Sequence, residues 1–252
     1  MPATGTRSGR KVASLDFPKS PPTILAMNDD TSAMVTGRKS AMPAWPIAVA
    51  AALIVLGLAG FLWAPVHALD IHILLAMRHP ETPSQLLGPP WFREMLRDFM
   101  GLGGEGVVVI FIACGLGVMW LAGRRREAWW FLANVLGAFV FESVLKHMIA
   151  RPRPELIPHE TYTFTASFPS GHTMMATVVW LWLALALADA AGKRAVRDFA
   201  VAGALVIAFV VGASRVYMGV HWPSDVVESW GLGLAWVWLL RYLGVGRLNV
   251  PR

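Results

Sequence analysis

The sequence predicts an all-α polytopic membrane protein, a bundle of six transmembrane helices. Of its 252 residues, 56% are hydrophobic and only 15% are charged, whereas about 25% are charged in an ordinary soluble domain. A soluble globule of this composition would expose a large apolar surface. A spanning helix needs about 20 predominantly apolar residues, and six segments meet this requirement: 45–64, 105–122, 128–147, 173–191, 199–217 and 223–243.

Residues 1–44 differ in composition from the rest of the chain. They are rich in Ser, Thr, Pro and scattered charge and have no sustained hydrophobic period, which is typical of a segment that cannot bury a core. We therefore expect two parts, a disordered basic cytoplasmic tail over 1–44 and a six-span domain over 45–252.

The distribution of Lys and Arg predicts how the helices cross the membrane. In a six-span protein the tail, the loops 123–127 and 192–198 and the C-terminal end share one side, and they carry fifteen of the 22 basic residues. Cytoplasmic loops are enriched in Lys and Arg, so we expect both termini in the cytoplasm. The external face still holds basic residues close to span ends, which points to a function there: Lys146, Arg151, Arg153 and Arg215.

The long external segment 65–104 contains one amphipathic stretch. Apolar residues recur at helical spacing with charged residues between them: Trp91, Phe92, Met95, Leu96, Phe99 and Met100. This pattern predicts a helix that lies in the membrane interface. A helix that packs against the bundle explains the pattern equally well.

Three external stretches, 146–154, 169–172 and 214–225, hold nearly all of the unusual polar residues. In the third stretch, His221 and Asp225 are four residues apart. Residues at this spacing on a helix can touch, so the carboxylate can fix the imidazole tautomer and leave the other ring nitrogen as a nucleophile. A His–Asp pair that only caps a helix is the more ordinary explanation of the spacing alone.

The second stretch suits an anion at a helix start. Ser170 is a plausible N-cap and Gly171 carries no side chain, so the first backbone N–H groups of the fourth span are available to an anion. His172 follows and can donate a proton to what binds there. An ordinary capped helix start is the simpler explanation of these residues alone.

Three cations face the same external compartment. Lys146 ends the third span, Arg153 lies between two prolines that terminate that helix, and Arg215 ends the fifth span. Arg can bind phosphate oxygens through two hydrogen bonds, and Lys adds a point charge. Singly, each could be an interfacial residue that extends its charge to water, but the combination of these groups indicates a site for a phosphate ester.

At these positions the sequence resembles the type 2 phosphatidic acid phosphatase (PAP2) family. The resemblance rests on eleven identities in a three-part signature: Lys146-x6-Arg153-Pro154, Pro169-Ser170-Gly171-His172 and Ser214-Arg215-x5-His221-x3-Asp225. The signature covers residues 146–225, and the six-helix layout extends the similarity over about 45–243.

The resemblance implies a role for each signature residue. His221 attacks phosphorus and forms a phosphohistidine intermediate, and Asp225 orients it. His172 protonates the departing oxygen and then assists the attack of water. Phosphate binding falls to five residues: Lys146, Arg153, Ser170, Gly171 and Arg215.

The resemblance also implies an activity and a location. We expect a hydrolase of phosphoric monoesters or diphosphates in the bacterial inner membrane, with its active site facing the periplasm. Expected substrates are undecaprenyl diphosphate, phosphatidylglycerophosphate or a phosphatidate-like lipid, so the partners are lipid phosphates and the bilayer rather than nucleic acid. No external cluster of carboxylates offers Mg²⁺ ligands, and the lone Cys114 excludes a cysteine-based zinc site. We therefore expect no metal and no other cofactor.

Three alternatives remain at this point. A lipid phosphotransferase would pass the phosphoryl group from the same histidine to an acceptor lipid. A vanadate-dependent haloperoxidase shares the signature, but those enzymes resemble soluble helical proteins. A transporter with an external anion site would carry charge at several depths, whereas the interior polar residues here reduce essentially to Glu142 and Glu228.

Two further expectations concern neighbours of the signature. Glu142 lies one turn before Lys146, so we expect an ion pair between them, and Glu228 is expected to support Asp225 in a similar way. The spacing of the signature selects Arg153 rather than Arg151. Arg151 is therefore assigned at most a headgroup contact, and Arg151→Ala is expected to leave most of the activity.

Overall fold

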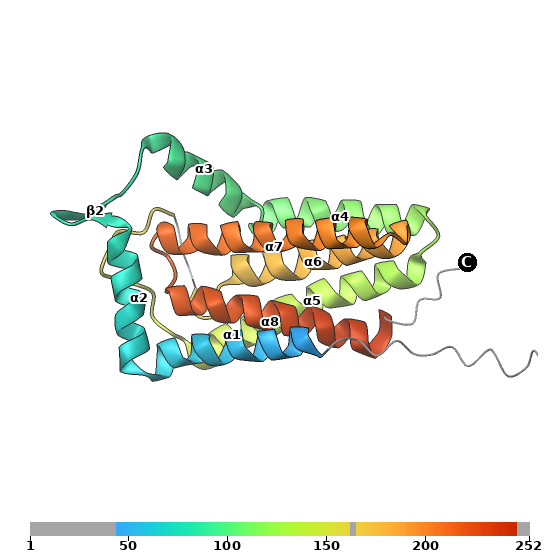
Figure 1. The fold of residues 1–252 in the computed structure, drawn as a ribbon, viewed down its shortest axis with the longest axis horizontal. Helices are drawn as coiled ribbons and strands as arrows, with labels where there is room; N and C mark the ends of the chain where they lie inside the picture. Colours follow the sequence, from blue (N-terminus) through green and yellow to red (C-terminus); the bar gives the residue numbers. More distant parts are fainter. Residues whose placement is uncertain (1–43, 162–164, 246–252) are drawn as a thin grey trace, which may run out of the picture. The chain divides into compact units, whose positions relative to one another are not determined.

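The computed structural model describes residues 44–161 and 165–245 (Figure 1). A long helix occupies each of the six predicted ranges: α1 (Trp45–Leu62), α4 (Glu105–Leu121), α5 (Arg125–Ile149), α6 (Gly171–Ala191), α7 (Arg194–Tyr217) and α8 (Pro223–Leu240). A π-helical turn, η2 (Arg241–Val245), follows α8. The tail predicted over 1–44 lies outside the described residues, apart from its last position, and stays a prediction.

The external segment between α1 and α4 contains more structure than the sequence indicated. It forms α2 (Ala64–Ala76), a two-stranded antiparallel hairpin of β1 (Arg78–His79) and β2 (Thr82–Leu86), and α3 (Pro90–Gly101). The hairpin is a departure from the all-α prediction. Its second strand reads TPSQL and is mostly exposed, so it lacks the alternation of apolar and polar residues that identifies a strand in a sequence.

Several helices are long and apolar enough to span a membrane. Among the described residues, four helices meet the length and hydropathy requirements of a membrane span: α1, α5, α6 and α7. The pair α3 and α4, bent by 45°, makes a fifth candidate if it is counted as one span. The fold is therefore that of a mostly helical membrane protein with four or five candidate spans, and the count of six remains a prediction.

α6 forms the centre of the bundle. It packs against α4, α5, α7 and α8, and its side chains Met174, Val178, Val179 and Trp182 are almost completely buried. Outward-facing positions of α4, α5 and α7 expose large apolar side chains instead, among them Val109, Ile110, Phe139, Val140 and Phe209. Such surfaces suit a lipid environment.

α1 lies along α8 at very close range (Figure 1). A Cβ atom at Gly57 would lie 2.3 Å from Glu228 Cβ, and one at Gly60 would lie 2.2 Å from Ser224 Cβ. Glycine is required at both positions because any side chain would force the helices apart, a packing mode common between membrane helices. The contact fixes the start of α8, where Asp225 lies.

Candidate active site

Three helix ends and one turn meet around one cavity. The C-terminal ends of α5 and α7 and the N-terminal end of α6, with the turn between α7 and α8, surround a cavity of about 880 Å³. Six of the eight predicted site residues line it: Lys146, Arg153, Gly171, His172, Arg215 and His221. The other two, Ser170 and Asp225, are fully buried and are not part of its wall.

Lys146 is held in place by the acid one turn earlier. Its Nζ lies 2.5 Å from Oε1 of Glu142, which confirms the expected ion pair. A Cβ atom at Gly171 would lie 2.7 Å from Oε1 of Glu142 and 3.3 Å from the Nζ atom. The glycine of the Pro-Ser-Gly-His motif is therefore needed so that the start of α6 can approach the ion pair.

The chain leaves α5 in a way that directs Arg153 to the site. Ala150 adopts a left-handed conformation with φ 47°, which ends the helix, and Pro152 cannot continue it. Arg153 then donates from Nε to the carbonyl of Thr165 at 2.8 Å and from Nη1 to that of Val220 at 2.6 Å. Burial lowers the pKa of Arg153, whereas the charge of Asp225 raises it.

His221 lies against Arg153 and is only 1% exposed. Nη1 of Arg153 lies 3.2 Å from Nε2 of the imidazole, so Nε2 accepts and the ring proton belongs on Nδ1. Burial lowers the pKa of His221 well below 6.5, and the charges of Arg215 and Arg153 lower it further. The ring is therefore neutral at pH 7, with the lone pair that a nucleophile needs on Nε2.

Asp225 has more partners than the sequence indicated. Its carboxylate accepts from Arg151 Nη1 at 2.5 Å, from Ser167 Oγ at 2.5 Å and from the backbone N–H of Trp222 at 3.1 Å. The last bond caps the first turn of α8, so the capping explanation of this residue holds in part. His221 Nδ1 lies 3.8 Å from Oδ2, which is an electrostatic contact but longer than the hydrogen bond we expected.

Arg151 corrects the interpretation of the sequence. The signature spacing assigns this arginine at most a headgroup contact. In the structure its side chain is 3% exposed and forms ion pairs with Asp225 and Asp70. Nothing in the signature spacing indicates these contacts. The lone carboxylate of Asp70 in an otherwise apolar run was the one signal that could have suggested a buried partner.

α6 begins directly after Ser170, as predicted, but the hydrogen bonds of Ser170 differ from those of a capping side chain. Oγ of Ser170 lies 2.8 Å from Oγ1 of Thr173, and the backbone N–H of Ser170 donates to Oγ of Ser229 at 2.8 Å. His172 lines the cavity beside the turn between α3 and α4. That turn approaches so closely that a Cβ at Gly103 would lie 2.5 Å from the carbonyl oxygen of His172.

The chemistry of this end of the cavity suits an oxyanion. Lys146, Arg153 and Arg215 bring three cations to one space with two imidazoles, an arrangement that stabilises negative charge in a site shielded from bulk water. Arg215 is buried, and its Nη1 is 2.8 Å from Sδ of Met100. Among the side chains that the structure describes, no group of three or more His, Cys, Asp and Glu residues is arranged to hold a metal ion.

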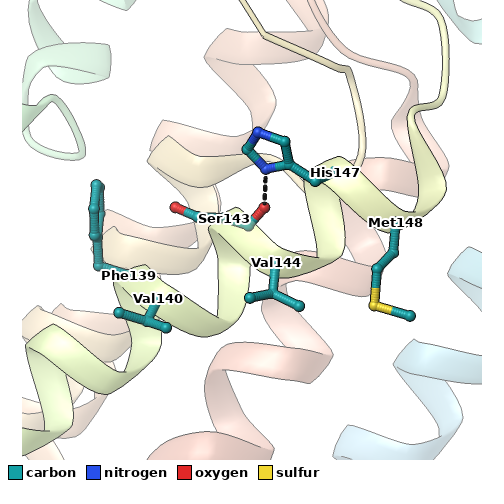
Figure 2. A pocket seen from close by; sticks show the side chains of 6 residues that line it. All are labelled: Phe139, Val140, Ser143, Val144, His147 and Met148. Atoms are coloured by element: carbon teal, nitrogen blue, oxygen red, sulfur yellow. Dashed lines mark hydrogen bonds between the residues drawn. The ribbon is translucent and has the colours of Figure 1, made fainter.

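Apolar side chains of α4 and α5 form much of the remaining wall, including Val108, Ile112, Leu132, Val135 and Leu136, and polar residues of the same helices, among them Glu105 and Ser143, also line it. A second, shallow hollow of about 340 Å³ lies on α5 and is shown in Figure 2. Phe139, Ser143 and His147 line both hollows. Nδ1 of His147 bonds to the Ser143 carbonyl at 2.7 Å. The two hollows are therefore neighbours on α5.

The fold and cavity define a helical membrane protein with a site suited to an oxyanion, and comparison with known proteins gives the family. The family model of the PAP2 superfamily matches residues 127–247. Phosphatidylglycerophosphatase B of Bacillus subtilis is 32% identical over 196 residues, which is 72% of this chain and 91% of that protein. An undecaprenyl-diphosphatase of Sulfolobus acidocaldarius is 29% identical over 115 residues, 40% of this chain and 46% of that protein.

A solved structure agrees with the sequence comparisons. The crystal structure of a transmembrane PAP2-type phosphatidylglycerolphosphate phosphatase from Bacillus subtilis superposes with a TM-score of 0.72 at 26% identity, over 83% of this chain and all of that one. The chain belongs to the PAP2 superfamily. It is a phosphatase, a hydrolase that acts on phosphate esters.

Proposed function

We propose that this chain is a membrane lipid phosphatase that hydrolyses lipid phosphate monoesters or diphosphates through a phosphohistidine on His221. One observation carries the proposal: a single cavity holds three cations and two imidazoles at one end and is apolar along α4 and α5. The polar end suits a phosphate group and the apolar wall suits the chain of a lipid.

The first chemical step is attack by His221. The Nε2 lone pair forms a bond to phosphorus while the bond from phosphorus to the leaving oxygen breaks, and His172 gives that oxygen a proton. The imidazole, which keeps its Nδ1 proton, becomes a phosphorylated cation that faces Asp225 at 3.8 Å. Lys146, Arg153, Arg215 and the N–H groups at the start of α6 stabilise charge on the three equatorial oxygens.

Water completes the reaction. It transfers a proton to His172 as its oxygen bonds to phosphorus, the bond between nitrogen and phosphorus breaks, and the electron pair returns to Nε2. The cations of the cavity neutralise the phosphoryl oxygens throughout, a task for which many phosphoryl-transfer enzymes use Mg²⁺. The reaction therefore needs no metal.

The substrate is a lipid whose chain leaves the cavity between α4 and α5. The apolar wall and the shallow hollow on α5 (Figure 2) support this direction. The relatives name the candidate headgroups, because one is a phosphatidylglycerophosphatase and another an undecaprenyl-diphosphatase. Phosphatidylglycerophosphate and undecaprenyl diphosphate are the first substrates to test, followed by phosphatidate.

The membrane arrangement that we propose is supported by charge and helix length. α1 and α4 to α8 form six spans of a domain over 45–252, the tail 1–44 and the C-terminus are cytoplasmic, and α3 lies in the interface. The excess of Lys and Arg at the other ends of these helices supports an active site on the periplasmic face of the bacterial inner membrane.

Phosphate release by the purified protein tests the proposal. The protein in detergent micelles should release phosphate from at least one lipid of the panel, and His221→Gln should reduce the rate by at least about 1,000-fold. His72→Gln, which changes an exposed histidine outside the cavity, is the control and should keep the full rate. Equal rates for His221→Gln and the wild type, or hydrolysis of water-soluble esters alone, would contradict the proposal.

Trapping the intermediate tests the mechanism. With undecaprenyl diphosphate labelled in its terminal phosphate, the leaving group is itself a phosphate and depends little on a proton from His172. His172→Ala should then accumulate acid-labile label on the protein, because water attack loses its base. The double variant His172→Ala/His221→Gln should carry no label. Label that persists in the double variant would assign the nucleophile to another residue.

A further inference from the structure

A buried network of charges surrounds Asp225, and none of its members lines the catalytic cavity. Arg151 is its centre. Nη1 of Arg151 donates to Oδ1 of Asp225 at 2.5 Å and to Oγ of Ser224 at 2.9 Å, and Nη2 donates to Oδ2 of Asp70 at 3.1 Å and to the carbonyl of Gly60 at 3.2 Å. The guanidinium therefore joins α1, α2 and α8.

The environment of this guanidinium is otherwise aromatic. Its central carbon lies 5.5 Å from the ring centroids of both Phe61 and Trp222, and the Arg151 side chain is 3% exposed. A planar guanidinium with several donors and two aromatic neighbours has little freedom to reorient. Arg151 is thus a fixed element of the structure.

Asp70 reaches the network from α2 and binds the start of α8. Oδ1 accepts from the backbone N–H of Ser224 at 2.8 Å, and Oδ2 accepts from Oγ of the same serine at 2.5 Å. A Cβ atom at Gly60 would lie 3.2 Å from Oδ2. Asp70 is 3% exposed, and 154 residues separate it from Ser224 in the sequence.

The charge count of the network matters for His221. Two buried carboxylates, Asp70 and Asp225, share the guanidinium of Arg151, and Nδ1 of His67 lies 3.4 Å from Nη2 of that guanidinium and 3.8 Å from Oδ2 of Asp70. Arg151 therefore neutralises only part of the charge of Asp225. The remainder faces the imidazole, which becomes a cation when it is phosphorylated, so the sharing strengthens the interaction that develops in the transition state.

We infer that Asp70 and Arg151 are positioning residues for the reaction, which act through Asp225. Arg151 fixes the direction of the Asp225 carboxylate. Asp70 keeps Arg151 from neutralising Asp225 completely and caps the helix on which Asp225 lies. The inference rests on the proposed function, because it assumes that His221 is the nucleophile.

The isosteric change Asp70→Asn tests the inference. It removes one carboxylate charge and leaves Arg151 bound to Asp225 alone, so kcat should fall by about tenfold. KM should stay within about twofold, because neither Asp70 nor Arg151 touches the substrate cavity. Glu94→Gln is the matched control: it neutralises an exposed acid, paired with Arg97 on α3, and should leave both constants unchanged.

A double-mutant cycle separates positioning from general destabilisation. If Asp70 acts through Asp225, Asp70→Asn should cost nothing further in the Asp225→Asn background. If the double variant instead loses activity by the product of the two single losses, the inference is wrong. It is also wrong if Asp70→Asn lowers the melting temperature but leaves kcat unchanged. If Asp70→Asn does not fold, Ser224→Ala takes its place in the cycle. The expected decrease in kcat for Ser224→Ala is about threefold, and the same two outcomes would contradict the inference.

His221→Gln, measured in the same series, distinguishes the failure of the inference from that of the proposed function. Full activity of His221→Gln would refute the proposed function. Loss of activity in His221→Gln together with a normal kcat in Asp70→Asn would refute the inference alone.

Discussion

Nη1 of Arg153 lies 3.2 Å from Nε2 of His221 and also donates to the carbonyl of Val220, while Nε and Nη2 of the same guanidinium donate to backbone carbonyls of the segment 165–166. The arginine is thus held by the loop that precedes α6 and by the residue before His221. It presents a cation at the nitrogen that we propose as the nucleophile. The geometry joins phosphate binding and nucleophile orientation in one side chain.

This relationship predicts that charge alone will not replace Arg153. Arg153→Lys keeps the cation but cannot form the same set of planar hydrogen bonds, so the rate of phosphate release should fall by about 100-fold or more. Arg97→Lys, an exposed arginine paired with Glu94 on α3, should have the wild-type rate. A fully active Arg153→Lys would mean that the guanidinium has no orienting role.

A single methyl group at Gly171 should disrupt the site. In Gly171→Ala, the new Cβ meets Oε1 of Glu142 at 2.7 Å, so the ion pair with Lys146 has to move and activity should fall by about tenfold or more. Gly203→Ala on α7, where no atom lies within 4 Å of the added Cβ, is the matched control. Equal activity of the two variants would show that the close approach is not needed.

Removal of Arg151 should be severely destabilising. Arg151→Ala leaves Asp70 and Asp225 buried without their cation, a change that costs about 3–5 kcal/mol. We expect a lower melting temperature in detergent and little activity, in place of the mild effect that the signature spacing indicated. A melting temperature equal to that of Arg97→Ala would contradict the role of the buried network.

The pKa of His221 predicts how stability depends on pH. In the unfolded chain this histidine takes up a proton as pH falls through about 6.5, whereas in the folded protein its pKa lies well below that value because of burial. Its contribution to folding stability is therefore present above pH 6.5 and lost as pH falls below it, by at most about 1.4 kcal/mol per pH unit. Melting temperatures between pH 7.5 and 5.5 should fall more steeply for the wild type than for His221→Asn. Parallel curves would mean that folding does not lower the pKa of His221.

Chelators and vanadate test the role of the cations. We propose that Lys146, Arg153 and Arg215 take the place of a metal, so phosphate release should survive EDTA unchanged. Orthovanadate should inhibit, since it imitates the five-coordinate phosphorus of the transition state. Loss of activity in EDTA that returns with Mg²⁺ would show that the cations are not sufficient.

Much of the fold follows from local sequence properties. Apolar runs of spanning length predicted a helix in each of the six ranges, and the i, i+4 spacing of Glu142 and Lys146 predicted their ion pair, which the structure confirms. The external segment was predicted less completely. α2 is apolar but too short to span, and the hairpin has no alternating pattern, so neither carries a periodic signal.

The partners of Asp225 could not be predicted from the sequence. Its spacing from His221 predicted a direct hydrogen bond, but the carboxylate turns to Arg151, Ser167 and the backbone of Trp222. Which neighbours a buried carboxylate meets depends on the rotation of α8 about its axis and on the close packing of α1 at Gly57 and Gly60. Neither quantity is encoded in the residues adjacent to Asp225.

By itself, the sequence determined that the chain is a helical membrane protein and indicated the residues that we propose as its phosphate site, because hydropathy and motif spacing are properties of short segments. Only the tertiary structure decided that Arg151, after α5, bridges Asp225 on α8 and Asp70 on α2. A charge in an apolar interior is stable only beside its counter-charge, and the packing of helices far apart in the chain selects that partner.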